Sequence, residues 1–216
     1  SINPYKDMML EYAGWVFNEA QATGLKGKWN SVFGNSQLPV DLEIGCGNGF
    51  FFEHQVRTVQ NRNLLGIEIK YKPLIQSVRR VRKLGLENGR GLRIQAEKIK
   101  SIFGTSELDQ IFIFFPDPWP KRRHKKNRLL KKEFWKTLAD IQKPNQLIHF
   151  KTDSEDYFDF VMEEVKGLPL EMTRYSRDLH KSEWAEENFQ TAFEKIFARQ
   201  GLPIYYAQFR NQKELT

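Results

Sequence analysis

The sequence predicts an α/β protein with a mostly parallel sheet covered by helices on both faces. From Val40 onward, short apolar runs alternate with amphipathic helical stretches, which is the pattern of repeated strand–helix units. Helices between successive strands require crossover connections, and these are right-handed. A glycine-rich stretch follows the first of these strands, and a proline-rich turn follows a later one. Both lie where such sheets bind ligands, at the carboxyl ends of the strands.

Each predicted strand is a short apolar run, and each helix shows apolar residues at helical spacing, as in the stretch from Tyr71 to Val81. The predicted strands are residues 40–44, 64–69, 92–94, 111–115, 147–150, 170–175 and 204–209. The predicted helices are residues 50–59, 71–81, 98–103, 128–141, 155–165 and 189–199. Residues 177–187 are polar and indicate a loop.

Residues 1–36 precede this alternation. An amphipathic stretch from Asp7 to Thr23 predicts a helix, and Gly24, Gly27 and Gly34 then mark a loop. This segment is interpreted as a helical lead-in that packs on the main domain and carries no chemistry of its own. Without internal repeats or a linker, residues 1–216 are expected to form a single domain.

The composition is that of a globular protein, with 40% hydrophobic and 28% charged residues. No apolar run is long enough to span a membrane, and no signal-peptide pattern opens the sequence. Cys46 is the only cysteine, which excludes an intramolecular disulfide and fits a reducing cytoplasm. The four histidines show no metal-ligand spacing, so no metal is expected.

The net charge of +7 is concentrated in one segment. Eight Lys or Arg and no acid lie between Lys121 and Lys132, so the rest of the chain sums to −1. A charge run is usually a solvated face. One that carries all the excess charge favours a polyanionic partner such as nucleic acid.

The glycine-rich stretch favours S-adenosylmethionine over a dinucleotide. Gly45, Gly47 and Gly49 follow a strand in the spacing Gly-x-Gly-x-Gly, which is not the dinucleotide fingerprint and weakens the case for a nicotinamide-dependent reductase. Glu43 beside the loop suits a cationic amino-acid group, and would repel a pyrophosphate. Glu68 ends the second strand, where a carboxylate can bind both hydroxyls of a ribose. A lone strand-end glutamate is as often solvated, but the two acids in order favour this donor.

The turn after the strand at 111–115 reads Pro-Asp-Pro-Trp-Pro and leads into the basic run. Proline ends the strand, and the turn presents Asp117 and Trp119 beside a patch suited to phosphates. Trp119 stacks on a base or ribose, or fills the core. For His124 a phosphate or packing contact is favoured over acid–base work, and Cys46 is interpreted as a small buried side chain. Asp153 is a candidate helix N-cap, a role compatible with a substrate contact.

Over nearly its full length the chain resembles bacterial tRNA (guanine-N7)-methyltransferases. The segments that carry the resemblance are Gly27-Lys28-Trp29-Asn30, Glu43-Ile44-Gly45-Cys46-Gly47, Gly66-Ile67-Glu68, Pro116-Asp117-Pro118-Trp119-Pro120-Lys121, Lys151-Thr152-Asp153 and Thr191-Ala192-Phe193-Glu194. The resemblance implies a Rossmann-like fold with an antiparallel last strand. It also implies S-adenosylmethionine as methyl donor and a guanine in the variable loop of tRNA as acceptor.

The resemblance also implies residue roles. Asp117 is expected to be catalytic, and the expected cofactor-binding residues are Glu43, Gly45, Gly47, Glu68, Gln95 and Asp117. Gln95 departs from the Asn or Asp that relatives often carry. The expected substrate-binding residues are Lys121, Asp153, Thr191, Ala192, Phe193 and Glu194. The expected tRNA phosphate patch is Arg122, Arg123, Lys125, Lys126 and Arg128.

Two other functions stay open from the residues alone. The turn at Asp117 superficially resembles the Asp-Pro-Pro-Tyr motifs of enzymes that methylate exocyclic amines, so another base position of RNA or DNA is an alternative. A non-enzymatic RNA-binding protein is a second alternative, disfavoured by the intact glycine loop. The expected partner is tRNA, with no membrane association, for a protein that is a monomer or a homodimer.

Overall fold

A computed structural model describes residues 2–214 of the chain. The chain forms two compact units, Ser1–Ile111 with Ile141–Lys143, and Phe112–Asp140 with Pro144–Thr216. We refer to them as unit 1 and unit 2. The single domain expected from the sequence stays a prediction. No helix in residues 2–214 is long and apolar enough to cross a membrane.

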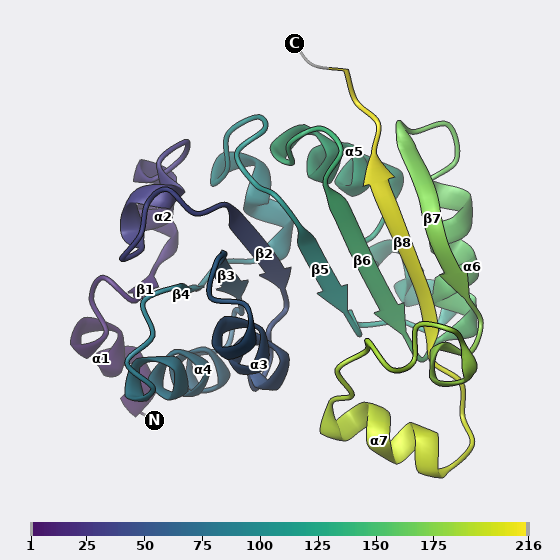
Figure 1. Ribbon diagram of the computed structural model, residues 1–216, viewed down its shortest axis with the longest axis horizontal. Helices are drawn as coiled ribbons and strands as arrows, with labels where there is room; N and C mark the ends of the chain where they lie inside the picture. The colour runs from purple at the N-terminus through teal and green to yellow at the C-terminus, as the bar shows by residue number, and fades with distance from the viewer. Residues whose placement is uncertain (1, 215–216) are drawn as a thin grey trace. The chain divides into compact units, whose positions relative to one another are not determined.

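In unit 1 the strands follow the order β1 (Val16–Phe17), β4 (Gly89–Leu92), β3 (Asn63–Ile67) and β2 (Val40–Ile44), and in unit 2 the order β5 (Ile111–Phe114), β6 (Leu147–Thr152), β8 (Tyr205–Asn211) and β7 (Leu170–Ser176) (Figure 1). In unit 1, β2 pairs with β3, β3 with β4 and β4 with β1, all in parallel. In unit 2, β8 pairs antiparallel with both β6 and β7, and its arrow points opposite to that of β6 in Figure 1. The predicted fold class is therefore confirmed, including the antiparallel last strand.

Unit 1 contains the first half of the strand–helix alternation. Its strands are β1 (Val16–Phe17), β2 (Val40–Ile44), β3 (Asn63–Ile67) and β4 (Gly89–Leu92). Its α-helices are α1 (Pro4–Glu11), α2 (Glu19–Gly24), α3 (Phe50–Thr58) and α4 (Tyr71–Lys83), with 3-10 helices η1 (Trp29–Val32) and η2 (Ala96–Ser101). The core of this unit is aliphatic around α4, and the Trp29 side chain is fully buried. That tryptophan belongs to the packing of unit 1.

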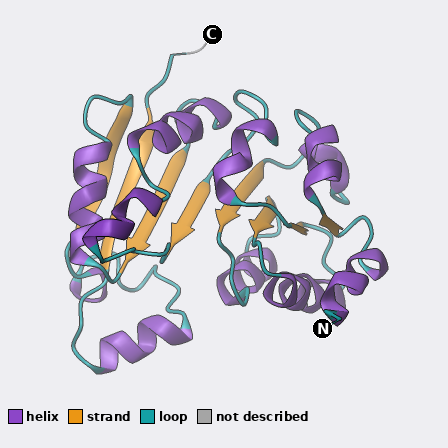
Figure 2. Ribbon diagram, turned by 180° about the vertical axis from the view of Figure 1, so that it is seen from behind, coloured by secondary structure: helices purple, strands orange, loops and turns teal. Residues whose placement is uncertain are grey.

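Unit 2 contains the second half. Its strands are β5 (Ile111–Phe114), which starts at the unit boundary, β6 (Leu147–Thr152), β7 (Leu170–Ser176) and β8 (Tyr205–Asn211). Its helices are α5 (Lys132–Ile141), α6 (Glu155–Glu164) and α7 (Ala192–Arg199), with 3-10 helices η3 (Arg122–Asn127) and η4 (Leu179–Lys181). Figures 1 and 2 both show α7 beyond the ends of the strands, at the end toward which β6 points.

The N-terminal segment differs from the prediction. The single helix expected from Asp7 to Thr23 is wrong, because α1 ends at Glu11 and α2 starts only at Glu19. Gly14 between them adopts a φ of +83°, a conformation that interrupts a right-handed helix. Val16 and Phe17 instead extend the sheet by pairing with β4. Amphipathic spacing alone could not show this, because a two-residue edge strand has no period.

Strand β4 begins earlier than predicted and includes two glycines. A Cβ atom at Gly91 would lie 2.7 Å from Cγ2 of Val78, and one at Gly89 would lie 3.0 Å from Cγ2 of Val56. The close approach of the helices therefore leaves no room for a side chain at Gly91 unless neighbours move, and little room at Gly89. The prediction began the strand at residue 92 because glycine weakens a strand pattern when its packing partner is unknown.

Two helices of unit 2 start later than predicted. Helix α5 begins at Lys132, four residues after the predicted start, because residues 122–127 form the separate helix η3. Helix α7 begins at Ala192, where Thr191 and Glu194 form a capping box in which each side chain bonds the other residue's backbone N–H.

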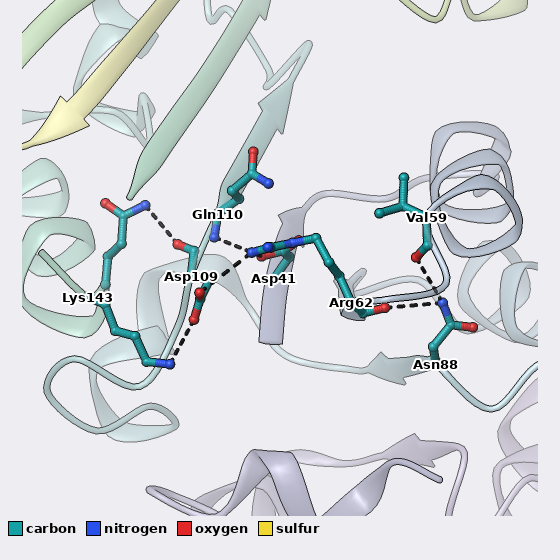
Figure 3. A network of polar contacts seen from close by, with 8 residues as sticks. Asp41, Val59, Arg62, Asn88, Asp109, Gln110 and Lys143 are labelled. Carbon is teal, nitrogen blue, oxygen red and sulfur yellow. Dashed lines mark hydrogen bonds and ion pairs between the residues drawn. The ribbon is translucent and has the colours of Figure 1, made fainter. Parts of the chain in front are cut away.

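A buried acid organises the amino-terminal end of β2 in unit 1 (Figure 3). Asp41 is 1% exposed and accepts two hydrogen bonds from Arg62, at 2.7 and 2.8 Å. Its Oδ1 also accepts from the backbone N–H of Gln110 at 2.8 Å. Arg62 further reaches Asp109 at 3.6 Å, and Lys143 pairs with Asp109 at 2.9 Å. Burial raises the pKa of Asp41 despite the Arg62 guanidinium, so this charge depends on its partner.

Arg62→Met is expected to destabilise the protein by about 2–4 kcal/mol, because it leaves the buried Asp41 carboxylate without its cation. Urea denaturation at pH 7 measures this. The double variant Asp41→Asn/Arg62→Met is the control, since the amide oxygen still accepts from Gln110 but carries no charge. It is expected to be more stable than Arg62→Met alone. A double variant as unstable as the single one would show that the charge is not the cause.

Candidate active site

The glycine loop of unit 1 has the backbone geometry that the sequence predicts. Gly45, Gly47 and Gly49 all adopt positive φ, at +76°, +52° and +75°. A Cβ atom at Gly49 would lie 2.0 Å from Oγ of Ser77, so this position admits no side chain. A Cβ atom at Gly45 or Gly47 would meet no atom of residues 2–214 within 4 Å, so the loop backbone is uncovered there. Such a loop allows close approach of a ligand.

The polar residues around this loop differ in exposure. Glu68 accepts hydrogen bonds from the backbone N–H of Gly47 at 3.1 Å and of Lys70 at 3.0 Å, so its carboxylate is held at the end of β3. Glu43 lies in β2 and is 3% exposed. Gln95 is exposed beyond β4 and makes no capping bond to the helix η2 that follows it.

Cys46 within this loop is buried, and burial raises the pKa of its thiol well above the usual value, with Glu43 and Glu68 adding to the effect. The thiol is therefore protonated at neutral pH. This agrees with the interpretation of Cys46 as a small buried side chain. Residues 2–214 contain no group of three or more histidine, cysteine or acidic side chains that could hold a metal ion.

The turn after β5 in unit 2 has a strained backbone. Phe115 and Trp119, which flank the Pro116–Pro118 segment, adopt φ values of +55° and +44°. For bulky residues this conformation costs about 1–2 kcal/mol each, and it persists only where the surroundings impose it. The N–H of Phe115 donates to the carbonyl of Lys151 at 2.8 Å, and the Phe115 ring meets that of Phe193 at 5.0 Å. These contacts fix the turn that presents Asp117.

Asp117 and Asp153 are the acids of this turn region that lack a partner. Asp117 is exposed and Asp153 is partly exposed, and neither side chain forms a hydrogen bond or ion pair with any residue from 2 to 214. They follow the neighbouring strands β5 and β6. The N-cap role expected for Asp153 is wrong, because the cap of α6 is Ser154, whose Oγ accepts from the N–H of Tyr157. Asp153 is thereby left available to a ligand.

Trp119 is half-buried rather than a core residue, and its ring meets the edge of His124 at 5.8 Å. His124 also accepts from Nε of Arg123 at 3.2 Å. The expectation of a phosphate or packing contact for His124 stays a prediction, and these two contacts are compatible with packing. The face of Trp119 that would stack on a base remains a prediction.

The basic run divides into exposed and buried members. Helix η3 leaves Lys121, Arg122, Arg123 and Lys126 exposed, whereas Lys125 is partly buried and pairs with Asp156 at 3.0 Å. Arg128, expected in the phosphate patch, has a side chain only 1% exposed. Its Nε donates to the carbonyl of Pro118 at 2.9 Å, and its guanidinium pairs with Asp156. An RNA phosphate cannot reach it, so the patch on this surface does not include Arg128.

The Thr191–Glu194 segment forms the start of α7 and mixes exposed with buried residues. Ala192 and Phe193 are exposed, and Thr191 is partly buried at the N-cap. Glu194 is fully buried and pairs with Lys151 at 2.9 Å. Burial would raise the pKa of Glu194, but the Lys151 ammonium and the surrounding hydrogen bonds outweigh it and hold this pKa below the usual value. Lys151 was not among the predicted site residues, although it begins the Lys151-Thr152-Asp153 segment of the resemblance, because a strand lysine does not by itself indicate its partner.

Comparison with known proteins agrees with this geometry. A family described as putative methyltransferases matches residues 37–207. The tRNA (guanine-N(7)-)-methyltransferase of Bdellovibrio bacteriovorus is 43% identical over 202 residues, which cover 93% of this chain and 97% of that protein. The protein of the same name from Bacillus subtilis is 35% identical over 183 residues, covering 85% of each chain.

Solved structures at much lower identity share the fold. An rRNA methylase from Streptococcus thermophilus superposes with a TM-score of 0.55 at 12% identity, over 82% of this chain and 88% of that one. Geranyl diphosphate methyltransferase gives a TM-score of 0.56 at 10% identity, over 82% of this chain and 79% of that one. The fold is therefore that of the Rossmann-like methyltransferases. Within that class, the chain belongs to the tRNA (guanine-N7)-methyltransferase family.

Arg128→Met is expected to destabilise the protein by about 2 kcal/mol, because the Pro118 carbonyl and Asp156 both lose a charged donor. The bond to Arg128, followed by that to Lys125, lowers the pKa of Asp156 below its usual 3.8. A lowered acid pKa contributes stability above the unfolded-state value and loses it as the pH falls. The difference between wild type and variant in urea denaturation should therefore shrink below about pH 4.

Lys126→Met is the matched control, since Lys126 is exposed in the same helical segment as Lys125 and makes no ion pair with residues 2–214. Its stability should stay within about 0.5 kcal/mol of wild type at every pH. Equal losses in the two variants would mean that Arg128 contributes only as a surface charge.

Proposed function

We propose that the protein transfers a methyl group from S-adenosylmethionine to N7 of a guanine in the variable loop of tRNA. The observation that carries the proposal is the similarity over 93% of the chain to a tRNA (guanine-N(7)-)-methyltransferase, together with the unpartnered Asp117 in the strained turn after β5. No observation favours a different base position or a protein without activity.

The residues of unit 1 fit the methyl donor. The uncovered backbone at Gly45 and Gly47 gives room for a ligand to lie against the loop. Glu68, already held by two backbone N–H groups, is oriented to accept from the ribose hydroxyls. Glu43 suits the cationic amino-acid group, and Gln95 suits an adenine edge. Bound there, S-adenosylmethionine supplies an electrophilic methyl group on a sulfonium.

The acceptor side requires no general base. N7 of neutral guanine bears a lone pair and no proton, so it forms the bond to the methyl carbon as the carbon–sulfur bond breaks. The guanine becomes cationic while the sulfur becomes neutral. Catalysis then consists of holding the reactants in line and stabilising the charge that develops. A carboxylate does both, by facing the cationic ring or by accepting from its N1 and N2 hydrogens. Asp117 is the proposed catalytic residue, and Asp153 is proposed to hold the guanine.

The other proposed substrate contacts lie in the same unit. Lys121 and the segment from Thr191 to Glu194 position the substrate, with Ala192 and Phe193 exposed to contact it and the buried Glu194 holding the segment in place. Arg122, Arg123, Lys125 and Lys126 bind tRNA phosphates. The protein works in the cytoplasm, as a monomer or a homodimer.

The direct test is incubation with unmethylated tRNA and S-adenosylmethionine labelled in the methyl group. Nucleoside analysis by liquid chromatography should recover the label in 7-methylguanosine, and mapping should place it in the variable loop. Label in a methylated exocyclic amine would instead support the alternative base position, and absence of donor binding in calorimetry would support the RNA-binding protein.

Asp117→Asn is expected to lower kcat by about 100-fold or more while the Kd for tRNA changes little, because the amide keeps the shape but loses the charge. Single-turnover kinetics and a filter-binding assay measure the two quantities. Asp159→Asn serves as the control, since that exposed acid on α6 pairs with Arg177, away from the turn. An Asp117→Asn variant with normal kcat and a raised Kd would reassign Asp117 to binding.

Replacing Lys121, Arg122 and Lys126 by glutamine should weaken binding to all tRNAs and reduce the slope of log K against log salt by about 2–3. The reason is that each lost phosphate contact releases one fewer counterion. The control replaces Lys136, Lys166 and Lys195 by glutamine, which removes the same charge from exposed positions elsewhere in unit 2. Its slope of log K against log salt is expected to stay steeper than that of the first triple variant. Identical slopes for the two triple variants would show that tRNA phosphates do not bind at Lys121, Arg122 and Lys126.

A further inference from the structure

We propose that Lys151 is a positioning residue for the tRNA substrate, acting through a buried charge network that ties three segments of unit 2 together. The inference rests on the proposed function, since it assigns a role within the same site. The three segments are the strained turn after β5, the Lys151–Asp153 end of β6 and the start of α7 with the loop before it. The family resemblance by itself gives this lysine no role.

The ammonium of Lys151 is enclosed by groups of unit 2. Its side chain is only 2% exposed. Nζ donates to Oε2 of Glu194 at 2.9 Å and to Oδ1 of Asn188 at 3.1 Å. It also lies 4.1 Å from the ring centroid of Phe114 and 5.7 Å from that of Phe115. The charge is thus neutralised by one acid and supported by two aromatic faces.

Glu194 completes the network from the other side. Its Oε1 accepts from Nδ2 of Asn188 at 3.0 Å and lies 3.3 Å from Nε2 of His180. Its Oε2 accepts from Lys151 and, at 3.2 Å, from the N–H of Thr191. Both oxygens are therefore occupied by groups from four different positions. In this arrangement Glu194 fixes the loop onto the strands, and its neighbours at the start of α7 are left to face the substrate.

The backbone of Lys151 adds a second link. Its carbonyl accepts from the N–H of Phe115, the residue with φ of +55° that begins the turn carrying Asp117. Two residues after Lys151, Asp153 follows the strand with no hydrogen-bond partner in residues 2–214. Lys151 thus bonds Phe115, which lies two residues before Asp117, and itself lies two residues before Asp153. Removing its charge leaves these backbone links in place but should displace the start of α7, whose Phe193 ring meets that of Phe115 in the turn, while unit 1 keeps its own contacts.

The energetics of a buried ion pair indicate that Lys151 and Glu194 position the segment around them and do not merely fill space. A buried ion pair adds little net stability compared with apolar residues of the same volume, but removing one partner leaves the other charge unpaired in a dry site. In Lys151→Met, Glu194 keeps its carboxylate with no cation, so its pKa rises. The segment from Asn188 to Glu194 can then relieve the charge only by moving toward water.

The test compares Lys151→Met with Leu138→Ala, which removes a fully buried side chain of α5 in the same unit without touching the network. Assays are run at a temperature where circular dichroism shows both variants folded. Lys151→Met is expected to raise the KM for tRNA and to lower kcat/KM at least about tenfold relative to Leu138→Ala. The Kd for S-adenosylhomocysteine by calorimetry should stay within about twofold of wild type, because the proposed donor residues of unit 1 are unchanged.

Two further readouts separate positioning from general destabilisation. Without Lys151, burial disfavours the charged form of Glu194, so lowering the pH shifts this carboxyl toward its neutral form. The activity deficit of Lys151→Met should therefore shrink as the pH falls, whereas that of Leu138→Ala should not. The double variant Lys151→Met/Glu194→Gln mimics that protonated form and should recover part of the lost kcat/KM. A deficit equal to that of Leu138→Ala, or one that neither pH nor the double variant relieves, would overturn the inference.

Hydrogen–deuterium exchange tests the inference independently of the enzyme assay. Peptides covering residues 186–196 should exchange faster in Lys151→Met than in Leu138→Ala, since the Thr191 N–H loses its fixed acceptor. Unchanged exchange contradicts the network role. A wild-type protein that exchanges as expected but does not methylate tRNA would contradict the proposed function alone.

Discussion

The buried pair between Lys151 and Glu194 is the interaction on which the order of unit 2 beyond the strand ends depends. The segment from 177 to 191 contains one short 3-10 helix, η4, and joins the rest of the unit through a small apolar cluster that includes Leu179, Ile204 and Tyr206. Phe115, Trp184 and Phe197 also pack against this cluster. The carboxylate of Glu194, whose two oxygens meet four partners, adds directional contacts to this apolar packing.

Unit 1 shows the same principle at the opposite end of its strands. Asp41 and Arg62 lie at the amino-terminal side of β2 and β3, far along the strands from the glycine loop that follows Ile44. There the pair joins the start of β2 to the residue that precedes β3. Glu68 does the equivalent at the carboxyl end by bonding the loop backbone. Asp41 and Glu194 are buried and held by cations, whereas Asp117 and Asp153 have no hydrogen-bond or ion-pair partner among residues 2–214.

The sequence was sufficient for the class of fold, for the glycine loop and for the acids at the strand ends. These depend on local spacing, which is visible as alternation of apolar runs and helical periods. It was insufficient where a residue's role depends on a distant partner. Arg128 looked like a surface cation because its neighbours are, and its burial depends on Asp156, 28 positions away. Lys151 lies in a segment that carries the family resemblance but was assigned no role, because its partner Glu194 is 43 positions away. The glycines of β4 and the break at Gly14 are further cases, since packing against α4 and pairing at a sheet edge leave no periodic signal.

The two buried cations Arg128 and Lys151 explain why the turn that carries Asp117 keeps its strained backbone. A bulky residue at positive φ is unstable unless neighbouring groups leave it no alternative. Arg128 holds the Pro118 carbonyl on one side of Asp117, and the Lys151 carbonyl holds the Phe115 N–H on the other. The turn is therefore fixed at both ends by residues that carry buried charges, while the carboxylate between them stays exposed. In the proposed role of Asp117, the methyl transfer needs no proton transfer at the acceptor, so a carboxylate held in a fixed position is the contribution asked of this turn.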